Sequence, residues 1–506
     1  MKRFALVTRL ALSALVAACG GSRAGSPPSD GGAEATADGP VETATGSDAG
    51  PGKDGSVGDG GGDAMVPQGC LAPGDPAFYA TPAVVGSGVR TVNVSPTSNP
   101  SLSQAFAGAQ PGDTIVLAAG TYTQSGGNLV LSASGTPAKW ITIQAAAGAT
   151  PLLDLAGAGE LSLGGSYVLL EGLEIEHGGG NNLHVAPVNG SVQDVIVRGC
   201  KIHDLTSGPG AAIKINSNNT INAGVSLVYI EGNDLSGSIG NAIVDAVATE
   251  KSVARGNYIH DNDLGDHGIF FKGGSSEILI ENNLVRGIRS NAAIQLGGAT
   301  GSTFFDPAHP DVEGFDELAR NNLVSDCDDA VVQVEGCAHA RIDHNTVVSQ
   351  TGFAIFRLNQ GSSSTGAPSD NSDVEITNNL VLATLPSMAD GVAGGPPQYA
   401  RDDGNATAVA IARELWGGAF INSASPGPGI PMFPQAGDVV VAAGALGTVV
   451  SNPSPTGIVS LQDALGRFAL VAGSPAKAAG VPDARVICDI TGAPRSATMP
   501  SIGAFE

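Results

Sequence analysis

A short pattern that returns eight times constrains this chain more than any other feature. Each copy has an apolar residue, two residues of any kind, a fixed position, one residue of any kind and a second apolar residue, as in Ile280–Val285. The fixed position is held by Leu173, Cys200, Asn233, Asn257, Asn283, Asn322, Asn345 and Asn379, at spacings of 27, 33, 24, 26, 39, 23 and 34 residues. A strand-length motif at such a period is typical of a solenoid, because one coil cannot bury its own apolar face. We expect the Asn amides to bond to one another between coils, and the Asn backbone to tolerate the left-handed region. The pattern predicts an all-β fold, a right-handed single-stranded parallel β-helix.

A second apolar segment follows each first one and supports the same fold. It usually has a small residue before a β-branched one: Ala212–Ile215, Ala242–Val244, Gly268–Phe271, Ala293–Leu296, Ala330–Val332 and Ala354–Phe356. Side chains alternate along a strand, so we expect the residue after the small one to face the core. Phe270 and Phe356 are then expected to face outward.

The first 69 residues are expected to lie outside the folded part. Residues 1–18 carry a basic start and an apolar run, and the stretch from Val16 to Cys19 resembles a bacterial lipobox, so we expect a lipoprotein signal peptide with Cys19 lipidated. Residues 19–69 are expected to form a disordered acidic linker, with eight acids against two bases. Residues 70–506 are expected to form one β-helix domain with its terminal caps. These features predict a lipid-anchored protein of the bacterial outer membrane or cell surface.

The charge of the chain limits its partners. The formal net charge is −24, which disfavours binding of nucleic acid through its phosphates. An acidic polysaccharide would also be repelled unless cations bridge it to the protein. We expect the protein to be a monomer. Besides Cys19, Cys200 occupies a ladder position and is expected to be buried and inert. A Cys327–Cys337 disulfide is one possible pairing, but the sequence alone cannot fix the pairing.

Both ends of the folded part resemble known proteins. The segment SLSQAFAGAQPGDTIVLAAGTYT, starting at Ser101, resembles the N-terminal capping helix and first coil of bacterial parallel β-helix proteins of the pectin-lyase-like superfamily. The segment from Gly473 to Glu506 resembles their closing coil. That group includes polysaccharide lyases, so the resemblance implies an enzyme of this kind.

The stretch from Ile259 to Gly274 is the richest in chemical groups. Asp261, Asp263 and Asp266 crowd one turn, and such carboxylates can hold Ca²⁺, which takes six or more oxygen ligands. DNDLGDHGIFFKGG, residues 261–274, resembles the calcium turn and downstream Lys of a bacterial pectate lyase family, and GIFFKGG resembles a coil of the chondroitinase B and alginate lyase family. In both resemblances Lys272 matches the base. The second family has an Arg one coil later, where this chain has Gln295.

These observations give a set of candidate residues. We assign Lys272 and His267 to catalysis, Gln295, His260 and Arg286 to substrate binding, and Asp261, Asp263 and Asp266 to a calcium site. The implied reaction is β-elimination on a polymer that contains uronic acid, in which a base removes the C5 proton and the C4 oxygen leaves. The alternative is a non-catalytic carbohydrate-binding or surface-structural protein that uses a strand face as a platform.

Overall fold

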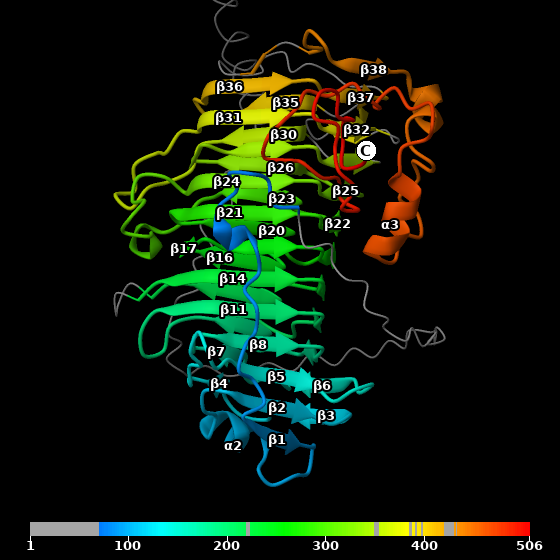
Figure 1. The fold of residues 1–506 in the computed structure, drawn as a ribbon. Helices are drawn as coiled ribbons and strands as arrows, with labels where there is room; N and C mark the ends of the chain where they lie inside the picture. The colour runs from blue at the N-terminus through cyan, green and yellow to red at the C-terminus, as the bar shows by residue number, and fades with distance from the viewer. Residues whose placement is uncertain are drawn as a thin grey trace, which may run out of the picture.

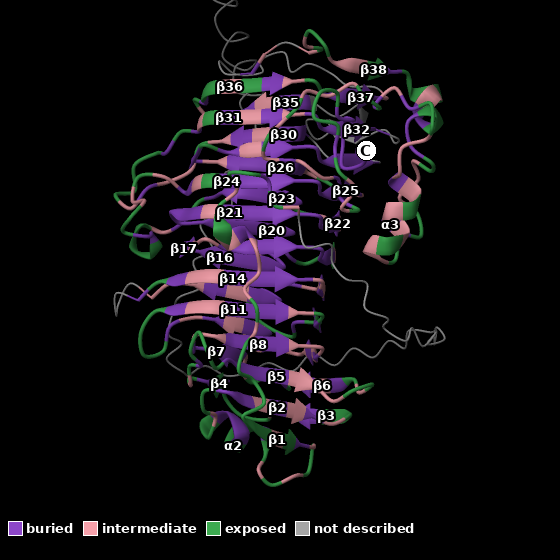
Figure 2. Ribbon diagram, in the orientation of Figure 1, coloured by how far each residue is buried: buried purple, intermediate pink, exposed green. Residues whose placement is uncertain are grey.

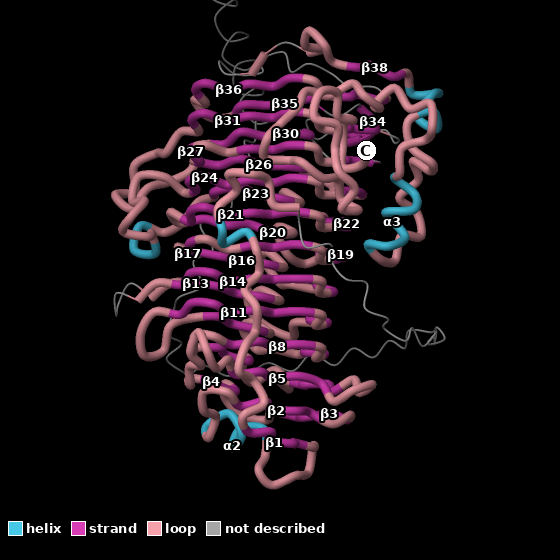
Figure 3. Tube along the Cα trace, viewed as in Figure 1, coloured by secondary structure: helices cyan, strands magenta, loops and turns pink. Residues whose placement is uncertain are grey.

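Three long parallel sheets run side by side along the molecule. The structure is a computed structural model that describes residues 70–218, 223–348, 354–383, 387–389, 392–395, 398–418, 430–431 and 433–506. The predicted signal peptide, Cys19 and the linker lie outside the described residues. Along most of the chain, successive strands belong to different sheets and each strand pairs with its equivalent one coil away, so the chain forms a right-handed parallel β-helix, as predicted (Figures 1 and 3).

The strands divide among the sheets as follows. The 14-stranded sheet comprises β1 (Arg90–Val94), β2 (Asp113–Leu117), β5 (Ile141–Ala145), β8 (Val168–Glu171), β11 (Val192–Arg198), β14 (Val225–Glu231), β17 (Thr249–Glu250), β18 (Val253–Arg255), β21 (Ser275–Glu281), β24 (Gly314–Arg320), β27 (Cys337–Ala338), β28 (Arg341–Asp343), β31 (Ser372–Thr377) and β36 (Thr407–Ala412). The 12-stranded sheet comprises β3 (Gly120–Thr123), β6 (Pro151–Asp154), β9 (Glu174–Glu176), β12 (Lys201–His203), β15 (Asp234–Ser236), β19 (Tyr258–Asn262), β22 (Leu284–Ile288), β25 (Leu323–Ser325), β29 (Thr346–Val348), β32 (Leu380–Leu382), β37 (Leu415–Gly417) and β38 (Val439–Val441). The 10-stranded sheet comprises β4 (Leu129–Leu131), β7 (Leu161–Leu163), β10 (Leu183–Val185), β13 (Ile213–Asn216), β16 (Val244–Val247), β20 (Ile269–Lys272), β23 (Ile294–Gly297), β26 (Ala330–Glu335), β30 (Ala354–Asn359) and β35 (Gln398–Asp402). A separate antiparallel pair joins β33 (Ser387–Ala389) and β34 (Val392–Gly395).

The remaining elements are short helices. They are η1 (Ala77–Tyr79), α2 (Leu102–Ala107), η3 (Ser302–Phe304), η4 (Ala443–Thr448) and α3 (Leu461–Phe468). Helix α2 is the predicted N-terminal cap, and Ser101 and Gln104 form a capping box at its start. Its buried side chains Leu102 and Phe106 join the apolar cluster that fills the β-helix, so α2 closes the end of the core. No helix in the described part of the chain is long and apolar enough to cross a membrane.

The predicted Asn ladder is present and buried. The Asn257 side-chain amide donates to Oδ1 of Asn283 at 2.9 Å, and equivalent bonds of 2.9–3.0 Å join Asn233 through to Asn379. The ladder ends at Glu414, which accepts from the backbone and side chain of Asn379. The left-handed backbone, however, belongs to the residue before each ladder position and not to the ladder Asn: Gly172, Gly199, Gly232, Gly256, Asn282, Asn321, His344 and Asn378. That turn position explains why Gly is frequent there.

Three of the six second segments have a register one residue away from the prediction. Val244, and not Ile243, pairs with the inward Ile213 of the preceding coil. In the same way Val332 pairs with Ile294, and Phe356 pairs with Val332. Phe356 therefore faces the core, where it is 1% exposed, and the prediction that it faces outward is wrong.

Apolar clusters cover the outer faces of two of the sheets. Most of the strand residues in the middle of the β-helix are buried (Figure 2). On the 14-stranded sheet, Trp140, Ile196 and Tyr229 pack with Tyr79 of the N-terminal segment, which crosses that sheet in Figure 1. On the 12-stranded sheet, apolar side chains from Tyr258 onward pack with the C-terminal part, including Phe468 of α3. The 10-stranded sheet belongs to neither cluster.

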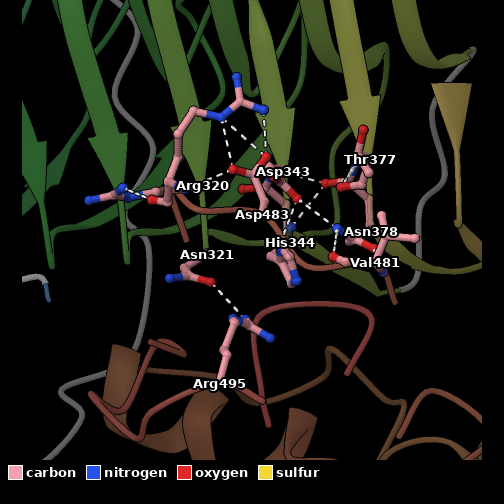
Figure 4. Close-up of polar contacts among 12 residues, drawn as sticks. Arg320, Asn321, Asp343, His344, Thr377, Asn378, Val481, Asp483 and Arg495 are labelled. Atoms are coloured by element: carbon pink, nitrogen blue, oxygen red, sulfur yellow. Dashed lines mark hydrogen bonds and ion pairs between the residues drawn. The ribbon is translucent and has the colours of Figure 1, made fainter. Parts of the chain in front are cut away.

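The C-terminal segment also docks on the left-handed turn positions (Figure 4). The amide of Asn378 exchanges two hydrogen bonds with the backbone of Val481, at 2.9 and 3.1 Å. Arg495 donates to Oδ1 of Asn321 at 2.8 Å, and Asp343 lies between His344 and Asn378. These polar contacts hold the C-terminal segment against the side of the β-helix. Residues 473–506 contain no strand and pack on the 12-stranded sheet, so the expectation that they form a closing coil is wrong.

One disulfide connects the two ends of the folded part. A disulfide joins Cys70 to Cys488 and so ties the N-terminal segment to the C-terminal one. Cys327 and Cys337 are not bonded to each other, so the Cys327–Cys337 pairing considered from the sequence is wrong: Cys327 precedes a strand of the 10-stranded sheet, whereas Cys337 begins one of the 14-stranded sheet. Cys200 is buried, as predicted, and burial raises the pKa of its thiol to about 12, which keeps it unreactive.

Candidate functional site

Strand β20 brings Lys272 to the outer side of the 10-stranded sheet. Ile269 and Phe271 of this strand point into the core, so Phe270 and Lys272 point outward. The Lys272 ammonium lies 4.6 Å from the centre of the Phe270 ring, which is a cation–π contact. Lys272 is only 8% exposed, so its charge lies in a largely desolvated place and interacts strongly with its neighbours.

His267 lies beside Lys272 and is neutral. Its ring meets Phe270 edge-on, with 5.0 Å between ring centres, and it is 9% exposed. Burial, reinforced by the charge of Lys272, lowers the pKa of His267 to about 3. Among the described residues neither ring nitrogen has a hydrogen-bond partner. An unpartnered buried imidazole is costly for the fold and is able to bond to a ligand.

Asp245 is the acid of this cluster, and the sequence analysis did not select it. It faces outward from β16, opposite Phe270, and is 1% exposed. Its carboxylate accepts from Nζ of Lys214 at 2.5 Å and from the side chain of Asn241 at 2.7 Å. Burial alone would raise the pKa of Asp245, but the positive charges of Lys214 and Lys272 lower it below its ordinary value. The signal that could have identified Asp245 is its place one coil before Phe270.

Gln295 connects the same face to a second acid. Gln295 lies opposite Phe270, and its Oε1 accepts from Nε2 of Gln333 at 2.9 Å. Gln333 also donates to Glu335 at 2.7 Å. Burial and the negative charge of Glu313 raise the pKa of Glu335 to about 7. A carboxyl group with such a pKa exchanges protons near neutral pH, which is useful to an acid–base catalyst.

His260 and Arg286 lie on a different sheet from Lys272. His260 belongs to β19 of the 12-stranded sheet, where its two ring nitrogens each lie 2.8 Å from a carboxylate, of Asp234 and Asp261. Arg286 donates to the hydroxyl of Tyr258 and to the carbonyl of Ile458, so the C-terminal segment covers it. The structure therefore does not bring these two predicted substrate-binding residues to the same site as Lys272.

The three aspartates of the predicted calcium turn do not converge. Asp261 bonds to His260, Asp263 has a side chain 76% exposed near Arg289, and Asp266 lies near Lys272. In the described residues, the groups of three side chains able to share one metal ion lie elsewhere. The expected ligand set is wrong, because the turn runs from one sheet to the next and carries its carboxylates apart. Calcium binding stays a prediction, and this turn does not supply a ligand set for it.

Comparisons with known proteins give a partial match. Residues 96–204, less than half of the chain, match the family model for Chondroitinase B. No curated protein matches the chain. The solved structures that resemble it include the pectate lyase Pel9A, with 17% identity, a TM-score of 0.48 and coverage of 84% of this chain and 99% of that one.

Two other solved structures are similar at a lower level. A mannuronic acid specific polysaccharide family 6 lyase from human gut microbiota has 14% identity, a TM-score of 0.43, and coverage of 70% of this chain and 83% of that one. A GH136 lacto-N-biosidase from Eubacterium ramulus has 13% identity, a TM-score of 0.44, and coverage of 70% and 68%. Lys272 lies outside residues 96–204, the segment that matches the Chondroitinase B family model.

Proposed function

We propose that this protein is a polysaccharide lyase that cleaves a uronic-acid polymer by β-elimination on the outer face of the 10-stranded sheet. The observation that supports this most is the cluster on that face. Two lysines, Lys214 and Lys272, act on one buried carboxylate, Asp245, next to a neutral imidazole. Cations of this kind attract the sugar carboxylate in a chain whose net charge of −24 would otherwise repel it.

In the proposed reaction, Lys272 in its neutral form takes the proton from C5 of the uronic acid. The electron pair of the C5–H bond forms the C4–C5 double bond, and the C4–O4 bond breaks with its electron pair on O4. The leaving oxygen takes a proton from water, and the hydroxide that remains takes the C5 proton from Lys272, which returns to its neutral form. The charge of Lys214 faces the sugar carboxylate and stabilises the negative charge that develops there, and His267 hydrogen-bonds to the sugar.

The donor set of the 261–266 turn does not fit a calcium ion, so no step is assigned to one. A catalytic role for Lys272 requires that some of it be deprotonated at the working pH.

The test is to incubate the protein with pectate, alginate and chondroitin polymers and to follow the ultraviolet absorbance of the C4–C5 double bond. A rise on one polymer, with unsaturated products in mass spectrometry, supports the proposal. If no polymer is cleaved but one is retarded with the protein in affinity electrophoresis, the lyase proposal fails and the binding-platform alternative replaces it.

A further inference from the structure

A second cluster of side chains, which could act as metal ligands, lies on the outer face of the 12-stranded sheet and is distant in sequence from Lys272. Asp154 ends β6 and pairs in register with Glu176, which ends β9 one coil later. His177 follows Glu176 directly and has a left-handed backbone, with φ of 60°. The three side chains therefore come from two stacked coils of rigid strand.

The ligand atoms of this cluster lie at distances that suit one metal ion. Nδ1 of His177 lies 3.1 Å from Oδ1 of Asp154 and 3.5 Å from Oε1 of Glu176, and the three ligand atoms lie within 4.8 Å of one another. Ligands placed 2.0–2.2 Å from Zn²⁺ in a tetrahedron are separated by roughly 3.4 Å. The two distances from Nδ1 of His177 are close to that edge, and the carboxylate oxygens of Asp154 and Glu176 lie within 4.8 Å of each other.

His203 lies on the other side of Glu176. Its Nε2 is 3.9 Å from Oε2 of Glu176, which is too long for a hydrogen bond. The two ring nitrogens of His203 instead bond to Asp204 and Glu174, at 2.9 Å each. The second oxygen of Glu176 therefore does not accept a hydrogen bond from His203.

The chain also carries a close copy of this arrangement that lacks one ligand. His260 lies between Asp234 and Asp261 in the way His203 lies between Glu174 and Asp204. His203 pairs in register with Glu176 of the preceding coil, whereas His260 pairs in the same way with Ser236. In the described part of the chain, two groups gather three metal-ligating side chains, Asp154–Glu176–His177 and Glu176–His203–Asp204, and both include Glu176. Only the first contains Asp154, so Asp154→Asn distinguishes them.

We propose that Asp154, Glu176 and His177 bind a divalent cation of the Zn²⁺ or Mn²⁺ type. A mixed set of one imidazole and two carboxylates suits these borderline ions better than Ca²⁺, which prefers six or more oxygens. The side chain of His177 is 39% exposed, so the ion can enter from solvent and keep water as a further ligand. The neutral His177 would bind through Nδ1 with its proton on Nε2.

The test is isothermal titration calorimetry of the metal-stripped full chain with ZnCl₂ and MnCl₂, together with the visible spectrum after Co²⁺ addition. One saturable site is expected, weakened at least about tenfold by Glu176→Gln or Asp154→Asn and unchanged by the matched variant His260→Ala.

Three outcomes would overturn the proposal: no saturable binding, binding that Glu176→Gln leaves intact, or equal loss in His260→Ala. In each case the cluster is a set of polar contacts between His177 and its carboxylates that binds no metal. Far-ultraviolet circular dichroism of every variant checks that it folds. Because the readout is metal binding, the result is independent of whether the protein cleaves a polymer.

Discussion

Replacing Asn283 with alanine removes four hydrogen bonds from the middle of the ladder. Oδ1 of Asn283 accepts from the backbone and side-chain amides of Asn257, at 3.0 and 2.9 Å. Nδ2 of Asn283 donates to the carbonyl of Ala254 and to Oδ1 of Asn322, both at 3.0 Å. The site is fully buried, so water cannot easily replace the lost partners. At about 1 kcal/mol for each bond, Asn283→Ala should lower the free energy of unfolding by about 4 kcal/mol.

The matched control is Cys200→Ala, at the equivalent position of an earlier coil. The Cys200 side chain makes only long sulfur contacts, of 3.4 and 3.9 Å, to carbonyl oxygens, so its loss should cost about 1 kcal/mol. Urea unfolding followed by circular dichroism measures both variants. If Asn283→Ala costs no more than Cys200→Ala, the ladder bonds do not stabilise the β-helix and the reasoning is refuted.

Three further predictions concern pH, the disulfide and metal chelation. Burial lowers the pKa of His260, but Asp234 and Asp261 raise it more, so the pKa in the folded protein lies above its ordinary value. The stability that His260 adds to the folded state is therefore present below the unfolded pKa and is lost as the pH rises through the folded pKa. The melting temperature of His260→Gln should therefore fall further below that of the wild type at about pH 5.5 than at about pH 8.5; equal differences would contradict this. Cys70→Ser opens the disulfide to Cys488 and should cost about 2–4 kcal/mol, and a reductant should lower the melting temperature of the wild type but not of the variant. EDTA should leave any lyase rate unchanged, whereas a rate lost with EDTA and restored by Ca²⁺ would reinstate calcium.

The repeating part of the fold was predictable because every coil buries the same groups. The Asn ladder could be identified without an alignment, since each amide needs the next one as a partner. The outward direction of Lys272 followed from strand alternation. The inward direction of Phe356 did not, because the coil of β26 has one residue more than its small-residue pattern suggested and the next coil keeps that register.

The composition of the candidate site was only partly predictable. His267, Lys272 and Gln295 share a face because neighbouring coils stack in register. Arg286 was misplaced because its partner is the carbonyl of Ile458, and no local pattern announces a contact that distant in sequence. The Cys70–Cys488 disulfide escaped prediction for the same reason.

The measurement that tests the central claim most directly compares two lysine variants on the polymer that the wild type cleaves. Lys272→Ala should abolish formation of the C4–C5 double bond while its circular dichroism spectrum stays that of the wild type. The control Lys201→Ala removes an outward lysine that also pairs with a carboxylate, Glu174 at 2.8 Å, but on the 12-stranded sheet, and it should keep the wild-type rate. Full activity in Lys272→Ala, or equal loss in both variants, would contradict catalysis on the face of the 10-stranded sheet.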